Sequence, residues 1–286
     1  MMTDQEILQA FQQALSKKKE IRLINAYKGL PISFPGTILS ITGDTVLVKV
    51  DRSQIVCMYR DHDTFVQGES FKETVKAHLT QIDLAKLEVI LSYFEIPDGS
   101  FNDRSNIRVE PNSPISGNIK TRDARIPFRG QLADISENGM GIWIEERLFH
   151  PNIYFPGAEI VVEVSLPTAS RIGTRTTVQY GAARDEQFDA QSVRLNMFSE
   201  LNKQGTSLSS TTFSINNAGG LELQGAVVRV HREQQMRRYR IGIRLKPNEM
   251  TRSIINLFVN SRQAEIINEI RAEYITLLGS GMQKPK

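Results

Sequence analysis

The sequence contains a single cysteine, Cys57, among its 286 residues. An internal disulfide and a zinc site built from several cysteines are therefore excluded. The formal net charge is only +3 at pH 7, which is too small to require a nucleic-acid or membrane partner. No apolar run approaches the roughly 20 residues of a membrane-spanning helix, and the first residues lack the basic and apolar regions of a signal peptide. We expect a cytoplasmic protein without membrane insertion.

The sequence also lacks the motifs of the common enzyme classes. It has no P-loop, no GxGxxG, no His-Glu-x-x-His and no GxSxG nucleophile elbow. The four histidines have no metal-ligand spacing. Asp61, His62 and Asp63 form one acidic cluster, but such neighbours are more typical of an exposed loop than of a metal site. We therefore expect no enzymatic activity, no catalytic residue, no metal and no cofactor.

Two helical patterns are present, one at each end of the chain. Residues 3–19 predict an amphipathic helix with the capping-box residues Thr3 and Glu6 at its start. Residues 251–286 predict a longer helix followed by a loose tail. This second helix has an apolar stripe, which usually packs on its own domain but could also join two copies or bind a partner. The stripe consists of Ile255, Phe258, Ile266, Ile270 and Tyr274.

Short β-type runs fill most of the sequence between the two helices. In residues 1–100 the runs are EIRLINAY, GTILSIT, TVLVKV, QIVCMYR and LEVILSYFEI. Closely spaced short strands of this kind predict a small barrel or sandwich. A linker signal, Pro-Asp-Gly-Ser, ends this first domain at residues 97–100.

A second series of β-type runs predicts another small barrel over residues 101–250. Its runs are SPISGNI, FRGQLADI, GMGIWIEE, AEIVVEVSL, LELQGAVVRVH and YRIGIRL. Residues 168–219 are polar and have no clear period, and they are too many for a plain loop, so we expect an insertion with structure of its own. The predicted fold is mostly β, with two small barrels in tandem and a helix at each end.

Two polar motifs in the second domain have an informative order and spacing. The pattern Arg-x-x-x-Arg occurs four times, at 104/108, 125/129, 171/175 and 240/244. The turn Asp134-x-Ser136-x-x-Gly139 begins 26 residues after Arg108, which leaves room for one strand out and one strand back. Only the 104/108 pair precedes the turn by such a distance, because the 125/129 pair is too close and the other two pairs lie downstream.

Arg104-x-x-x-Arg108 followed by Asp134-x-Ser136-x-x-Gly139 resembles the signature of PilZ domains, which are bacterial receptors for cyclic di-GMP. The resemblance extends over roughly residues 101–275, apart from residues 168–219. Residues 1–100 are similar, more faintly, to the barrel that precedes the PilZ domain in flagellar-brake-type proteins. The resemblance implies that cyclic di-GMP binds to five residues at the junction of the domains: Arg104, Arg108, Asp134, Ser136 and Gly139.

The chemistry of these residue types suits the implied ligand. Arginine can bind phosphate with two hydrogen bonds, donate to guanine O6 and N7, and stack on a base. A carboxylate such as Asp134 can accept from the N1–H and N2–H groups of guanine. Ser136 can cap the turn or reach the ligand, and Gly139 permits a positive φ and a close approach. Trp143 can stack on a base, although a place in the core is favoured.

The resemblance also implies a regulated protein partner, of which flagellar or secretion machinery would be examples, and an output in motility, biofilm or polysaccharide production. Family members with a basic residue before the first arginine can hold two ligands, whereas Asp103 here favours one per chain. A homo-oligomer through the C-terminal helix remains an alternative, as does a PilZ-like adaptor without a ligand. A nucleic-acid-binding barrel is the other rival class, because RVHREQQMRRYRIGIR is locally basic. We expect no DNA partner, since a hairpin with solvated charges explains that stretch more simply.

Overall fold

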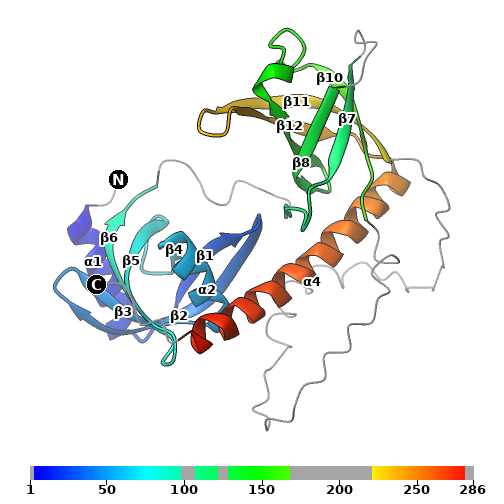
Figure 1. The fold of residues 1–286 in the computed structure, drawn as a ribbon. Helices are drawn as coiled ribbons and strands as arrows, with labels where there is room; N and C mark the ends of the chain where they lie inside the picture. Colours follow the sequence, from blue (N-terminus) through cyan, green and yellow to red (C-terminus); the bar gives the residue numbers. More distant parts are fainter. Residues whose placement is uncertain (1–2, 98–106, 122–127, 168–220, 281–286) are drawn as a thin grey trace, which may run out of the picture. The chain divides into compact units, whose positions relative to one another are not determined.

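The computed structural model describes residues 3–97, 107–121, 128–167 and 221–280 (Figure 1). Arg104, its neighbour Asp103 and the predicted insertion at 168–219 lie outside the described residues. The described chain is mostly β, with two closed six-stranded antiparallel barrels and helices near both ends. This architecture confirms the predicted fold class.

Six strands close the first barrel in the order β1-β2-β3-β6-β5-β4. These strands are β1 (Ile21–Tyr27), β2 (Leu30–Thr42), β3 (Thr45–Lys49), β4 (Asp63–Gln67), β5 (Val75–Asp83) and β6 (Glu88–Glu95). Alternate side chains of the strands fill the barrel, including Leu23, Val48 and Leu91, none of which has exposed surface. The predicted runs in β1, β2, β3 and β6 are confirmed, whereas β4 and β5 were not predicted.

Helix α1 (Asp4–Ser16) precedes the first barrel and has the predicted capping box, in which Thr3 and Glu6 each bond to the other's backbone N–H. Its apolar face is buried through Ile7 and Phe11. The ring of Phe11 packs at 4.8 Å from that of Phe71 and at 4.9 Å from that of Phe94, measured between centroids. The helix is therefore held by the hydrophobic core of this barrel.

The prediction of a strand for QIVCMYR is wrong, because these residues lie in helix α2 (Arg52–Asp61). The side chain of Asp51 caps the helix by accepting from the N–H of Ser53 at 2.7 Å. Five consecutive residues, 54–58, are buried, so the middle of the helix has no polar face and no helical period in its sequence. The β-branched neighbours Ile55 and Val56 favour a strand, which explains the wrong prediction.

The second barrel closes in the order β10-β11-β12-β9-β8-β7. Its strands are β7 (Ser116–Thr121), β8 (Phe128–Ser136), β9 (Gly139–Glu145), β10 (Glu159–Val164), β11 (Leu221–Glu233) and β12 (Arg238–Leu245). A 3-10 turn, η1 (Glu146–Leu148), follows β9. All six predicted runs of this domain contain a strand. The barrel positions β8 and β9 as a tight hairpin, in which Ser136 pairs with Gly139.

The long helix α4 (Glu249–Gly279) follows the second barrel, and Asn248 caps it by accepting from the N–H of Thr251 at 2.8 Å. Four residues of the predicted stripe, Ile255, Phe258, Ile266 and Ile270, are at most 5% exposed. The fifth, Tyr274, donates its hydroxyl to the carbonyl of Leu84 at 3.1 Å. The stripe therefore packs within this chain. No described helix meets both the length and the hydropathy required to cross a membrane.

Candidate functional site

The hairpin of β8 and β9 presents one face to the barrel core and the other to the outside. Along β9, Met140, Ile142 and Ile144 are buried in the core. Because side chains alternate along a strand, Gly139, Gly141 and Trp143 occupy the opposite face. On β12, which pairs with β9, Gly242 lies opposite Gly141. Three glycines thus contribute no side chain to the centre of this outer face, so that other side chains can lie against its backbone.

The segment that carries Arg108 is joined to β8 by backbone hydrogen bonds. The N–H of Val109 donates to the carbonyl of Ile135 at 3.0 Å, and the N–H of Ile135 donates back at 3.1 Å. Strand β7 pairs with β8 only up to Gln131, which leaves the last part of β8 without a partner from β7 on this side. The backbone of Ile135 can therefore pair with Val109. This bridge brings Arg108 beside the Asp134–Gly139 turn, as the spacing of the two motifs predicted.

Asp134 is the centre of the charged groups on this face. The residue is 4% exposed, and its Oδ1 accepts from Nη1 of Arg108 at 3.2 Å. Its Oδ2 forms an ion pair with Nη2 of Arg240. A buried carboxylate needs compensating charge and hydrogen bonds, and here two guanidinium groups supply both. Burial lowers the pKa of Arg108.

Glycine gives these side chains room at two positions. A Cβ on Gly139 would lie 3.1 Å from the carbonyl oxygen of Ile243 and 3.2 Å from Nη2 of Arg108. A Cβ on Gly141 would lie 3.1 Å from Oδ2 of Asp134 and 3.2 Å from Nε of Arg240. Gly139 does not adopt the positive φ that glycine permits, since the described glycines with positive φ are Gly29, Gly43 and Gly157. Close approach, and not backbone conformation, is what Gly139 provides.

Ser136 closes the turn between β8 and β9. Its hydroxyl donates to the carbonyl of Gly139 at 3.1 Å, and the residue is 2% exposed. This is the capping role, one of the two roles open to it from the sequence. The oxygen of Ser136 keeps lone pairs with which it can accept a further hydrogen bond.

Trp143 lies on the outer face and is half-buried, which corrects the expectation of a core position. The guanidinium of Arg238 is centred 3.8 Å from the Trp143 ring and that of Arg240 is 5.5 Å from it. Cations at these distances are attracted by the face of the indole ring. The tryptophan and its arginines therefore extend the charged patch along β9 and β12.

Arg240, Gly141 and Gly242 belong to the site but were not among the residues predicted for it. Arg240 was set aside because it lies downstream of the turn, and that exclusion is wrong, since β12 returns it to Asp134 from the other side. For Gly141 the signal was present in the sequence. It lies two residues from both Gly139 and Trp143, so the period of a strand places it on their face. Arg104, the remaining predicted residue, lies outside the described residues.

Other candidate features serve the structure or pair locally. Asn25 donates to Asp61 at 3.1 Å, and Asp63 pairs with Lys76 at 3.3 Å. In the described ranges, no three His, Cys, Asp or Glu residues are grouped so that they could hold a metal ion. In the basic stretch, Arg232 pairs with Glu146 and Arg238 with Glu233, so part of its positive charge is neutralised.

The site combines two cations, a carboxylate, a flat face and an aromatic ring. Guanidinium groups bind phosphate oxygens or the acceptor edge of guanine, and a carboxylate can accept from the donor edge of guanine. A carboxylate offers about four lone-pair positions, so Asp134 can keep its arginines and accept further hydrogen bonds. The chemistry of this face therefore fits a ligand that contains both phosphate and purine groups.

Comparison with known proteins gives matches of low similarity. No family model matches the chain. A protein of Aquifex aeolicus (strain VF5) described as uncharacterized is 25% identical over 108 residues, which are 38% of this chain and 51% of that protein. The chain therefore spans about half the length of this relative.

Three solved structures with low similarity to the chain come from bacterial proteins. The MrkH complex with c-di-GMP from K. pneumonia is 12% identical at a TM-score of 0.40, covering 93% of this chain and 97% of that chain. The inhibitor of motility MotI/DgrA from Bacillus subtilis is 10% identical at 0.37, covering 86% and 96%. YcgR from Escherichia coli in complex with c-di-GMP is 12% identical at 0.36, covering 94% and 95%.

A PilZ domain of YcgR with c-di-GMP is also among the matches, at a TM-score of 0.35 and 13% identity, covering 59% of this chain and 97% of that chain.

Proposed function

We propose that the chain is a receptor for cyclic di-GMP, which binds on the outer face of the second barrel. The observation that supports this most is the pairing of Arg108 with the buried Asp134, beside glycines that let these side chains lie close to the backbone. The two residues come from separate motifs, and their meeting gives one face both a phosphate-binding cation and a guanine-reading anion.

Each residue of the motifs has a distinct role in this proposal. Arg104 and Arg108 bind the phosphates and the O6 and N7 edge of a guanine. Asp134 accepts from N1–H and N2–H of that base and so selects guanine over adenine. Ser136 holds the turn and accepts a hydrogen bond from the ligand. Gly139 keeps the backbone open where a base or the guanidinium of Arg108 must approach closely.

Arg240 and Trp143 complete the binding surface. Arg240 shares Asp134 with Arg108 and adds a second cation to the phosphate side. Trp143 offers a flat ring on which a base can stack. The neighbouring Arg238 and Arg240 attract an anionic ligand to this ring. We expect one cyclic di-GMP per chain, because Asp103 places a negative charge next to Arg104.

The proposed output is a change in how the two barrels are presented to a protein partner. Residues 97–107 join the barrels, so a ligand bound through Arg104 and Arg108 acts on the connection between them. A partner that recognises only the ligand-bound arrangement then responds to the concentration of cyclic di-GMP. Pull-down of the purified chain with and without cyclic di-GMP identifies such a partner from the difference between the two samples.

The direct test is isothermal titration of cyclic di-GMP into the wild-type chain and into Arg104→Ala, Arg108→Ala and the double variant. We expect saturable binding at micromolar concentration or below, weakened at least about tenfold by each single change. Arg147→Ala is the matched control, because Arg147 is exposed and pairs only with the neighbouring Glu145 in the described contacts. Wild-type protein without saturable binding would overturn the proposal.

Two further titrations separate this function from its rivals. Cyclic di-AMP has the same sugar–phosphate ring, so binding as tight as that of cyclic di-GMP would remove the role of Asp134 as guanine reader. Binding to RNA or DNA that depends steeply on salt and is unaffected by Arg104→Ala and Arg108→Ala would favour a nucleic-acid-binding barrel instead.

A further inference from the structure

The backbone from Arg108 to Glu110 is held from two sides. On one side Val109 is bridged to Ile135 of β8. On the other side, the N–H of Glu110 donates to the carbonyl of Lys28 at 3.0 Å, at the turn between β1 and β2. Gly29 lies so close to this segment that a Cβ on it would be 2.9 Å from the carbonyl oxygen of Arg108. The backbone next to the ligand-binding arginine is therefore fixed in position.

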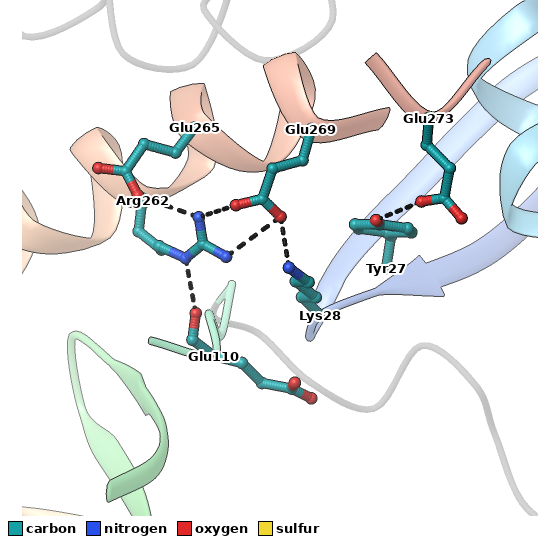
Figure 2. A network of polar contacts seen from close by, with 7 residues as sticks. All are labelled: Tyr27, Lys28, Glu110, Arg262, Glu265, Glu269 and Glu273. Carbon is teal, nitrogen blue, oxygen red and sulfur yellow. Dashed lines mark hydrogen bonds and ion pairs between the residues drawn. The ribbon is translucent and has the colours of Figure 1, made fainter. Parts of the chain in front are cut away.

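Arg262 of α4 supplies the remaining contact. It is 2% exposed, and its Nε donates to the carbonyl of Glu110 at 2.8 Å. Its Nη1 donates to Glu269 at 2.7 Å and to Glu265 at 3.0 Å. Figure 2 shows the planar guanidinium between the helix carboxylates and the Glu110 carbonyl. A buried guanidinium with so many directed bonds has one orientation, so it fixes the carbonyl that it holds.

These contacts close a ring of four residues. Glu110 bonds to the backbone of Lys28, the ammonium of Lys28 pairs with Glu269 at 2.5 Å, Glu269 accepts from Arg262, and Arg262 returns to Glu110. Burial raises the pKa of Glu269, but the hydrogen bonds from Arg262 and Lys28 outweigh it and lower that pKa overall. The ring thus contains a carboxylate that stays ionised at neutral pH and two cations that depend on it.

We propose that Arg262 is the positioning residue of Arg108. By holding the Glu110 carbonyl, Arg262 sets the backbone two residues away, so that the Arg108 guanidinium rests on Asp134 before any ligand arrives. Through Glu269 and Lys28, the same ring ties Arg108 to α4 and to the β1–β2 turn. The ligand part of this inference rests on the proposed function.

The test compares Arg262→Gln and Arg262→Lys with Arg271→Gln, which makes the same charge change at an exposed position of the same helix. Amide hydrogen exchange is measured without ligand. We expect Arg262→Gln to raise exchange at Val109, Glu110 and Ile135 by about tenfold while the amides of β9 keep their protection. Arg262→Lys keeps the positive charge but has a single donor nitrogen, and it should restore part of the protection, whereas Arg271→Gln should resemble the wild type.

The second measurement is the affinity for cyclic di-GMP of the same variants. We expect Arg262→Gln to weaken binding about tenfold, Arg262→Lys to weaken it less, and Arg271→Gln to leave it unchanged. If Arg262→Gln does not fold, Glu269→Gln replaces it in both measurements. This substitution also loosens the Arg262 guanidinium, because it removes the negative charge that Arg262 and Lys28 share.

The outcomes of the two measurements are distinguishable. Unchanged exchange at residues 109 and 110, or exchange raised equally throughout both barrels, would overturn the positioning role. Selective exchange with unchanged affinity would also overturn it, because Arg108 would then bind its ligand without help from Arg262. Wild-type protein that binds no cyclic di-GMP would overturn the proposed function alone, since the exchange measurement without ligand still decides the role of Arg262.

Discussion

Arg240 and Asp134 are 106 residues apart in the sequence, yet they form an ion pair on the outer face of the second barrel. Arg108 reaches the other oxygen of the same carboxylate from 26 residues before it. Asp134 therefore joins three parts of the chain, namely the segment before β7, the β8–β9 hairpin and β12. Changes at this carboxylate should affect both stability and ligand binding.

Asp134→Ala should lower the free energy of unfolding by about 1–3 kcal/mol, because two largely buried guanidinium groups lose the counter-charge they share. Asp134→Asn keeps the shape and one acceptor, and it should cost less. Urea unfolding followed by circular dichroism measures both. Equal free energies of unfolding for Asp134→Ala and the wild type would contradict a stabilising effect of these ion pairs.

Asp134→Asn should also remove the preference for guanine. The substitution replaces one acceptor oxygen by an NH2 donor, so the side chain can no longer accept from both N1–H and N2–H of guanine, whereas the phosphate contacts of the arginines remain. We expect the ratio of the affinities for cyclic di-GMP and cyclic di-AMP to fall towards one. The two ligands are titrated into wild type and variant by calorimetry. A ratio that stays at its wild-type value would assign guanine recognition to another residue.

Trp143 should report the ligand by its fluorescence. It is the only tryptophan in the chain, and it lies beside Arg240 on the proposed binding face. We expect cyclic di-GMP to change its emission with a midpoint equal to the calorimetric dissociation constant, and we expect Arg108→Ala to shift that midpoint. Binding by calorimetry without any change in emission would place the ligand away from Trp143.

Gly139→Ala and Gly141→Ala should weaken ligand binding while the barrel still folds. Each added Cβ would lie 3.1–3.2 Å from a guanidinium, carboxylate or carbonyl atom, so Arg108, Asp134 or Arg240 must shift by a few tenths of an ångström. We expect a loss of affinity of about tenfold for each variant. Gly279→Ala is the control, since an added Cβ there meets nothing within 4 Å. Wild-type affinity in both site variants would contradict the proposed location.

The ring around Glu269 should make stability sensitive to acid. Since the pKa of Glu269 is lowered in the folded chain, its stabilising effect is full above its unfolded pKa of about 4.3 and is lost as the pH falls through the lower, folded value. The free energy of unfolding should therefore fall more steeply below pH 4.3 in the wild type than in Glu269→Gln. Parallel curves for the two proteins would exclude a contribution from this carboxylate.

The second barrel could be predicted from the sequence to a large extent. All six of its runs contain a strand, because each strand has one face in the core and the other outside, and this alternation is visible in the sequence. The first barrel was harder. Helix α2 is buried along residues 54–58, so its period is hidden, and the runs DTFVQ and VKAHLTQID of β4 and β5 were missed. Local patterns fail where burial is uniform or the run is short.

The sequence by itself determined that Arg108 would reach the Asp134 turn. The 26 residues between them are enough for two antiparallel strands, and the second strand of such a pair ends beside the start of the first. The period of two in a strand also places Gly141 and Trp143 on one face with Gly139. That this face is the outer one was decided by the barrel, since a core position was expected for Trp143. Only the tertiary structure decided that Arg240 shares Asp134 and that Arg262 holds Glu110, 152 residues earlier. Such pairs depend on the closure of a barrel and on the packing of a helix, and neither leaves a spacing in the sequence from which a contact can be calculated.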